Sequence, residues 1–335
     1  MKSKIAQLPR KILIERGAIE RVEEIIDSLG ERPLVVADSV TKNIAGEHIR
    51  KQIDGEIILI KDSTIEEVKR VEEQKTDCII SVGGGKVIDV GKLAAHNKNI
   101  PFVSFPTACA HDGIASENVS LTVNGKYSSI QATAPFGVIA DLDILLKSAY
   151  RTTASGAADI ISKYTSIFDW NLGKKNGEEY SEPIANLSLM AIDLVSSSIE
   201  EIKNRTEKGI SNLVWSLIFS GMAMTLHGSS RPASGAEHMF SHALDRLGSF
   251  GLHGEQVGIG TIFFSCLQEQ DWRKIQKLLS DLSAPTKAAD LKIPQDVLVK
   301  AFLEAKNMRK RYTILDEKPL TEEIILDVCK KTGIL

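Results

Sequence analysis

Residues 10–142 alternate between short apolar runs and amphipathic stretches, and this alternation restricts the possible folds more than any other feature. Apolar runs rich in β-branched residues occupy 11–15, 33–38, 56–60, 77–85 and 101–105, with stretches of helical spacing between most of them. Strands that alternate with helices of about 10–15 residues are typical of a parallel sheet with helices on both faces. The run GVIADLDIL, at 137–145, is predicted to be the last strand of that sheet.

Two local signals add detail to this half of the chain. Ser63 is followed three residues later by Glu66, a capping-box pattern that predicts the start of a helix. Residues 119–130 alternate apolar and polar side chains around Asn124-Gly125, which predicts a β-hairpin.

After about residue 150 the strand signals stop. Apolar residues recur about every 3.6 positions in six segments, which are 154–171, 181–203, 207–227, 233–247, 255–269 and 298–311. We therefore expect an α/β N-terminal domain with a Rossmann-like parallel sheet (1–150) and an all-helical C-terminal domain (151–335). The boundary is predicted between Ser148 and Thr153, and the active site in the cleft between the domains.

Composition excludes several classes of protein. Lys and Arg number 41 against 44 Asp and Glu, and the net charge of −3 argues against a broadly basic nucleic-acid-binding protein. The four cysteines lie far apart, which is typical of reduced thiols in a cytoplasmic protein. The N-terminal stretch lacks the apolar core of a secretory signal, and no window approaches 18 continuous apolar residues. We expect a cytoplasmic protein without a membrane span.

A glycine-rich segment lies between a predicted strand and a predicted helix. Gly83-Gly84-Gly85-Lys86 lets the backbone approach a ligand closely, and the helix start offers unpaired N–H groups that suit a pyrophosphate. The segment is not a GxGxxG motif, and a tight turn without a ligand is the alternative. Asp38, at the end of the second strand, either binds ribose hydroxyls or caps the next helix.

Histidines gather in the second half of the chain. His238 and His242 are four residues apart on one predicted helix face, and His253 directly precedes another helix. Met239 stands where a zincin carries glutamate, which argues against a metalloprotease. Asp159, on a helix of small and apolar residues, is the most suitable upstream acid, although Lys163 could simply be its ion-pair partner. Asp159, His238 and His253 would leave a fourth position open, as a catalytic zinc requires.

The segment 104–116 follows a strand and has no clear periodicity, so a loop over the cleft is expected. The hydroxyls of Thr107 and Ser116 could bind a cofactor, and His111 and Asp112 could face a substrate. A plain connecting loop has a similar composition.

Several segments together resemble the superfamily of dehydroquinate synthase, glycerol dehydrogenase and iron-dependent alcohol dehydrogenases. The similarity is greatest to the sn-glycerol-1-phosphate dehydrogenase family and extends over nearly the whole chain. The segments that carry it are GGGKVID (83–89), PTACAHDGIAS (106–116), SGAADIISKY (155–164), SGAEHMFSHALD (234–245), HGEQVGIGT (253–261) and RYTIL (311–315).

The resemblance implies a dehydroquinate synthase-like fold and an enzyme that uses NAD(H) or NADP(H) and one Zn²⁺ per chain. It would reduce dihydroxyacetone phosphate to sn-glycerol 1-phosphate for archaeal-type ether phospholipids. Asp159, His238 and His253 would bind the zinc, while Asp112, Asp159 and His242 would contact the substrate. The cofactor would contact Gly84, Gly85, Lys86, Val87, Thr107, Ala108, Cys109, Ala110 and Ser116, in addition to Asp38.

Related activities differ at single positions. Similar iron alcohol dehydrogenases carry His where this chain has Lys163, and dehydroquinate synthases carry Glu where it has Asp159, so both readings are less favoured. Glycerol dehydrogenase, which acts on an unphosphorylated substrate, fits the metal set equally well and is the nearest alternative, ahead of a dehydroquinate synthase-like lyase. Lys163, Arg309 and Arg311 are candidate phosphate-binding cations. A homo-oligomer is compatible with the sequence.

Overall fold

A computed structural model describes residues 6–248 and 250–335. Residues 1–5, which belong to the stretch predicted to lack a secretory signal, lie outside it, as does Ser249. Six parallel strands form one sheet in the order β1-β8-β5-β4-β2-β3. These strands are β1 (Lys11–Glu15), β2 (Pro33–Ala37), β3 (Glu56–Leu59), β4 (Cys78–Gly83), β5 (Phe102–Pro106) and β8 (Gly137–Asp141). The predicted parallel sheet is confirmed.

The last predicted strand is shorter than expected and lies inside the sheet. β8 ends at Asp141, whose carboxylate accepts hydrogen bonds from the backbone N–H groups of Asp143 and Ile144 and so begins helix α5 (Leu142–Leu145). β8 pairs with β1 on one side and with β5 on the other. The strand signal in 137–145 therefore continued into a helix because Leu and Ile suit both structures.

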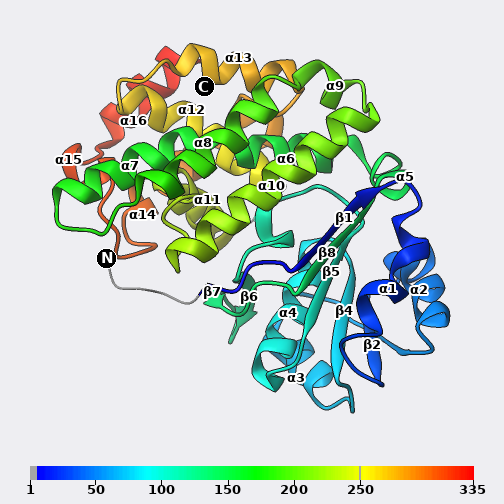
Figure 1. Ribbon diagram of the computed structural model, residues 1–335. Helices are drawn as coiled ribbons and strands as arrows, with labels where there is room; N and C mark the ends of the chain where they lie inside the picture. The colour runs from blue at the N-terminus through cyan, green and yellow to red at the C-terminus, as the bar shows by residue number, and fades with distance from the viewer. Residues whose placement is uncertain (1–5, 249) are drawn as a thin grey trace.

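The central strands β2, β4 and β5 are buried along their whole length, because helices cover both faces of the sheet (Figure 1). On β4, Ile79 packs toward α3 (Ile65–Glu72) and α4 (Gly85–Lys98), whereas its neighbour Ile80 packs toward α1 (Glu23–Ile26) and α2 (Glu47–Gln52). Successive side chains of a strand point to opposite faces, so a continuous apolar run fills two cores.

The predicted hairpin is present as β6 (Asn118–Val123) and β7 (Lys126–Gln131), paired antiparallel. Asn124 and Gly125 turn with φ of 51° and 72°, as a two-residue hairpin loop requires. The predicted helix start is shifted by one residue, and a single cap takes the place of the predicted capping box. Thr64 caps α3 by accepting from the Glu67 N–H, the Glu67 carboxylate accepts from the Lys61 N–H, and the Ser63 hydroxyl donates to the Ser120 carbonyl on β6. Ser63 thus fixes the hairpin to the sheet.

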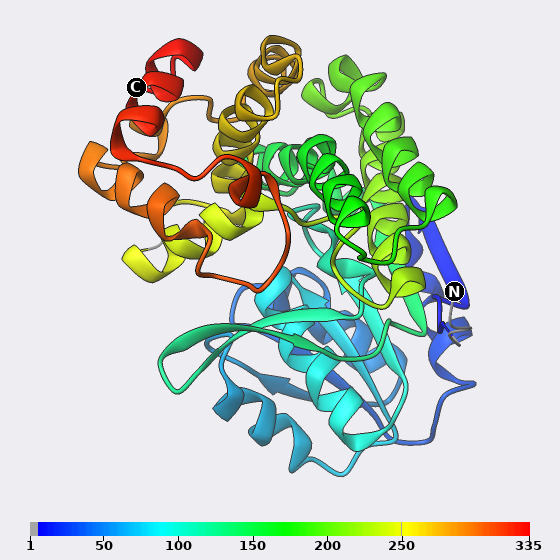
Figure 2. The same cartoon turned by 90° about the vertical axis from the view of Figure 1, so that its left-hand side faces the viewer.

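From residue 150 on, the described residues form helices and loops, as expected (Figure 2). The predicted segments 154–171 and 181–203 are each divided into two helices, and the chain leaves the helix before 309. The helices are α6 (Tyr150–Ile161), α7 (Lys163–Lys175), α8 (Glu182–Ser196), α9 (Ile199–Lys203), α10 (Glu207–His227), α11 (Ala236–Leu247), α12 (His253–Leu267), α13 (Trp272–Asp281), α14 (Gln295–Ala305), α15 (Ile314–Glu317) and α16 (Glu322–Thr332).

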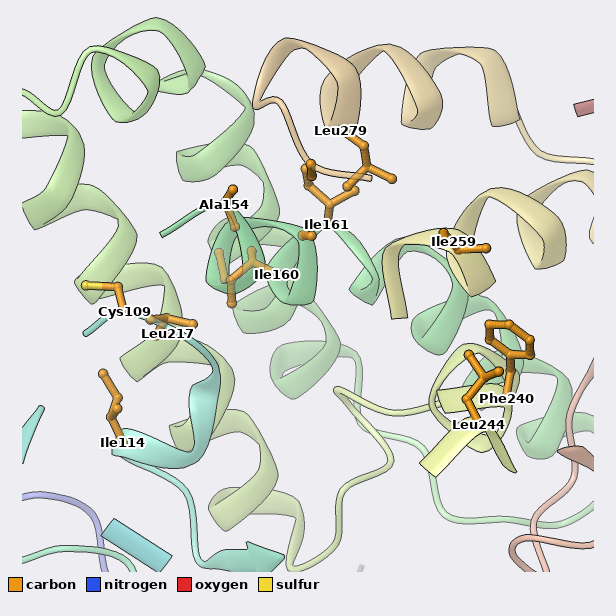
Figure 3. Packing of buried hydrophobic residues seen from close by; sticks show 14 of the residues in the cluster. Cys109, Ile114, Ala154, Ile160, Ile161, Leu217, Phe240, Leu244, Ile259 and Leu279 are labelled. Atoms are coloured by element: carbon orange, nitrogen blue, oxygen red, sulfur yellow. The ribbon is translucent and has the colours of Figure 1, made fainter. Parts of the chain in front are cut away.

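One apolar core continues from the sheet into the helical half. Cys109 and Ile114, from the loop after β5, lie beside Leu217 of α10, and the same cluster continues through Ile160 of α6 to Phe240 of α11 (Figure 3). It also contains the side chains on the inner face of the sheet. The loop after β5 is therefore anchored on both halves.

α10 is the one helix among the described residues that is long and apolar enough to cross a membrane, with a mean hydropathy of 1.4 over its best window. In the fold, 67% of that window is buried, and the helix packs against α8, α9 and α6. Its apolar surface is covered by protein, as in the core helix of a globular domain.

Candidate active site

A cavity of about 280 Å³ lies between the two halves of the molecule. Its lining includes Gly85, Lys86 and Asp89 from the glycine turn and α4, His111, Asp112 and Ser116 from the loop after β5, and Ser230, His238, His242, His253 and Arg309 from the helical half. Residues that the sequence assigned to cofactor, metal and substrate therefore lie around one space.

The three predicted metal ligands come together beside this cavity. Asp159 on α6, His238 on α11 and His253 at the start of α12 each offer a ligand atom, and these atoms all lie within 4.8 Å of one another. One carboxylate and two imidazoles, of which Asp159 and His238 are buried and His253 is half-buried, suit a divalent transition metal.

Hydrogen bonds orient both imidazoles of this set. His238 Nδ1 lies 2.8 Å from Glu237 Oε1, and His253 Nδ1 lies 3.2 Å from Ser241 Oγ. Each ring thus uses Nδ1 for a neighbouring oxygen, which leaves Nε2 as the nitrogen available for a metal. Such outer hydrogen bonds are characteristic of metal-binding histidines, so the residues present fit a metal site.

The charge states of Asp159 and His253 also fit, whereas His238 must lose a proton to bind a metal: burial lowers the pKa of His238, but hydrogen bonds to Asp159 and Glu237 raise it above its usual value. Burial opposes ionisation of Asp159, but the Lys163 ammonium and the His238 imidazole hold its pKa well below the usual range. Burial, together with the charge of His238, lowers the pKa of His253 to about 3. A carboxylate and a neutral imidazole are the forms that bind metal ions.

Lys163 lies fully buried between two carboxylates. Its Nζ is 2.7 Å from Asp159 Oδ1 and 3.1 Å from Asp112 Oδ2, and the Ser220 hydroxyl donates to the same Asp112 oxygen at 2.7 Å. The alternative interpretation of Lys163 as the ion-pair partner of Asp159 agrees with this geometry. Because it is enclosed, Lys163 is poorly placed to bind a substrate phosphate, whereas Asp112 is fixed at the cavity wall.

His242 lies one helical turn after His238 and faces the cavity. Burial and the neighbouring positive charges, first that of Arg309, lower the pKa of His242 well below its usual value. The imidazole is therefore neutral at pH 7.

The glycine turn occupies the carboxyl edge of the sheet where the strand order reverses, between β2 and β4. Gly84 caps α4, and a Cβ atom added there would meet no described atom within 4 Å. Lys86 Nζ lies 3.3 Å from Asp38 Oδ2, while Asp38 Oδ1 accepts the backbone N–H groups of Val40 and Thr41. Asp38 thus makes the predicted turn-capping contacts and remains next to the glycine turn.

The remaining predicted cofactor residues have different surroundings. The backbone N–H of Thr107 donates to the Gly83 carbonyl at 3.1 Å, which joins the loop after β5 to the glycine turn. Val87 and Cys109 are buried in the apolar core, so either could reach a cofactor only through its backbone. Ser116 lines the cavity, whereas Ala108 and Ala110 do not. His111 lies over the glycine turn, because a Cβ on Gly85 would come within 2.0 Å of its Nε2.

Comparison with known proteins shows the family. The chain is 42% identical over 344 residues to glycerol-1-phosphate dehydrogenase [NAD(P)+] from Pyrococcus abyssi, with 99% of each protein covered. The protein of that name from Methanothrix thermoacetophila is 42% identical over 343 residues, covering 98% of this chain and 97% of its own. The chain belongs to the glycerol-1-phosphate dehydrogenase family. Residues 13–149 also match the family model for iron-containing alcohol dehydrogenase.

Solved structures show the same fold at lower identity. Glycerol dehydrogenase from Schizosaccharomyces pombe superposes with a TM-score of 0.83 at 20% identity and covers 99% of this chain and 91% of its own. A probable glycerol dehydrogenase from Sinorhizobium meliloti gives 0.84 at 20% identity, with 99% and 100% covered. The chain thus shares its fold with these structures, and the expected fold class is confirmed.

Two buried carboxylates that organise this region were not singled out by the sequence analysis. Glu237, fully buried, accepts from the Thr165 hydroxyl and contacts His238, so it connects α7 to the metal-ligand set. Asp169 accepts the N–H groups of Ala236 and Ile314, the first residues of α11 and α15. The adjacent pair Glu237-His238 was a visible signal for the first, whereas no local pattern indicates the second.

Proposed function

We propose that the protein is an NAD(P)-dependent oxidoreductase that interconverts dihydroxyacetone phosphate and sn-glycerol 1-phosphate with one zinc ion. The observation that carries this proposal is the convergence of two features on a single cavity. The largely buried set of Asp159, His238 and His253 lies on one side, and the glycine turn lies on another. Full-length relatives named for this reaction support it.

The metal-ligand set, the glycine turn, Asp112 and His242 have separate roles in this reaction. Bound by the Asp159 set, a zinc ion supplies Lewis-acid polarisation of a substrate oxygen, and NAD(P) at the glycine turn supplies or accepts the hydride. Asp112, held by Lys163 and Ser220, accepts a hydrogen bond from a substrate hydroxyl. His242 is neutral, so it can accept the proton that an alcohol releases on oxidation and return it in the reverse direction.

The test compares two ketones with the zinc-loaded enzyme. We expect consumption of NADH or NADPH with dihydroxyacetone phosphate, and at least about a hundredfold lower kcat/KM with unphosphorylated dihydroxyacetone, since two charge-assisted hydrogen bonds are lost. Stereochemical analysis should give the sn-glycerol 1-phosphate configuration. Equal efficiency on both ketones would favour glycerol dehydrogenase, and cofactor turnover without net consumption would favour a lyase.

The wider assignments follow the sequence resemblance. We propose that the reaction serves ether-phospholipid synthesis in the cytoplasm, and that residues 1–150 and 151–335 act as the cofactor-binding and the metal- and substrate-binding domains. The substrate is a small molecule, with no part for nucleic acid.

A further inference from the structure

A second cavity, of about 440 Å³, adjoins the first. The two share five lining residues, which are Asn118, Ser129, Ser230, His242 and Arg309. Of the described residues that line the second cavity, three are arginines (Arg246, Arg309 and Arg311) and none is acidic. The reaction cavity therefore opens onto a space whose walls carry positive charge.

Two of these arginines meet at one hydroxyl. Arg309 Nη1 donates to Ser230 Oγ at 2.9 Å, and Arg311 Nη2 donates to the same oxygen at 3.0 Å. A serine hydroxyl has two acceptor positions and one donor. With both acceptor positions used, the Ser230 proton is the group left to donate, and Ser230 lines both cavities.

Positive charge is concentrated around these groups. Arg231 lies near Arg311 and is paired with Glu178 at 2.7 Å. Burial, and then the charges of Arg309 and Arg231, lower the pKa of Arg311 to about 9, which still leaves it charged at pH 7. Repulsion among the guanidinium groups of Arg309, Arg311 and Arg231, which the carboxylates of Glu178 and Glu237 offset only in part, favours a bound anion.

We propose that Arg309, Arg311 and Ser230 bind the phosphate of the substrate and thereby select phosphorylated over unphosphorylated ketone. The inference rests on the proposed function and adds the groups that set its substrate preference. His242 lines both cavities, so the carbon chain passes it between this subsite and the metal-ligand set. Arginine suits this role because its planar fork matches two phosphate oxygens at once.

The experiment compares Arg309→Gln with Lys310→Gln. Lys310 is the adjacent residue, is exposed and lies outside both cavities. The variant Lys310→Gln therefore removes one positive charge, as Arg309→Gln does, but leaves the subsite intact. We measure kcat/KM for dihydroxyacetone phosphate and for dihydroxyacetone. Arg309→Gln should lower the ratio of kcat/KM for dihydroxyacetone phosphate to kcat/KM for dihydroxyacetone roughly ten- to a hundredfold. Arg309→Lys should lower this ratio less, and Lys310→Gln should leave it unchanged.

A binding measurement without turnover accompanies the kinetics. Inorganic phosphate should raise the unfolding temperature of the wild type and of Lys310→Gln, and raise it less for Arg309→Gln. Equal ratios and equal phosphate stabilisation in the two glutamine variants would overturn the subsite. A wild-type enzyme that is inactive on dihydroxyacetone phosphate would instead refute the proposed function. If inorganic phosphate still stabilised that inactive wild type more than it stabilised Arg309→Gln, the phosphate subsite would stand although the proposed reaction failed.

Discussion

At the scale of the residue, the three-ligand set depends on each member. We expect His253→Ala to weaken zinc binding by more than about a hundredfold, beyond the usual effect of losing an outer hydrogen-bond partner, and to abolish nearly all activity. The fold should persist, because the apolar cores do not include the imidazole. Metal content after dialysis, measured by mass spectrometry, checks the binding.

His48→Ala is the matched control for this variant. His48 is half exposed on α2 and contacts Glu20 at 3.2 Å, far from the metal-ligand set, so its removal should leave the zinc content at the wild-type level. Full zinc occupancy in His253→Ala would show that His253 is not a ligand.

Gly84 gives a second prediction at the residue scale. We expect Gly84→Val to raise the KM for NADH or NADPH at least about tenfold, because a branched Cβ would exclude a pyrophosphate from the start of α4. The KM for the ketone and the unfolding midpoint should change little, since a Cβ there meets no described atom within 4 Å. Steady-state kinetics with each substrate varied in turn give the result. An unchanged cofactor KM would mean that the glycine turn is only a connection between strand and helix.

At the scale of the element, Asp169 joins three helices. Its two oxygens accept the N–H groups at the starts of α11 and α15 and the side-chain amide of Gln268 on the turn after α12. In Asp169→Asn the side-chain NH₂ group would replace one of these acceptor oxygens and point at an N–H donor, which would leave both buried groups without a hydrogen bond. We therefore expect the free energy of unfolding to fall by about 2–4 kcal/mol. Denaturant titration measures the change.

A surface cap provides the comparison for Asp169. Asp271 accepts only the Lys274 N–H at the start of α13, and Asp271→Ala should reduce the stability by about 1 kcal/mol. Similar losses in the two variants would contradict the special position of Asp169.

The elements also show where sequence patterns are sufficient. Apolar runs rich in β-branched residues mark strands clearly, so strands β1 to β5 were predicted to within about two residues at each end, the partly exposed edge strands β1 and β3 included. Helix breaks were missed, because the apolar period continues across Ser162 although the chain turns there. The cap of α3 moved from Ser63 to Thr64 because Ser63 bonds the hairpin, a contact between residues 57 positions apart.

At the scale of the whole molecule, the fold class could be predicted from the order of local strand and helix signals. The grouping of Asp159 with His238 and His253 was predicted from their chemistry as ligands and from the family resemblance. The sequence suggested the pair of Asp159 and Lys163, but it did not connect Asp112 to Lys163 or either arginine to Ser230. Their arrangement depends on α6, α10 and the loop after α14 meeting in space. The hydrophobic periodicity of one sequence predicts helices and strands, but it carries no information on such contacts between distant elements.

The continuous core has a consequence for how this chain could be recombined with its relatives. Cys109 and Ile114 are set against Leu217 of α10, and Gly156 leaves no room for a side chain because the Cys109 carbonyl would be 1.9 Å from it. A chimera joined near residue 150 would take these surfaces from two different parents, so each would pack against a surface with other side chains. We expect a chimera of two family members to fold only where the loop after β5, α6 and α10 all come from the same parent. These three segments, and not the two halves, are therefore the part that must be exchanged as one.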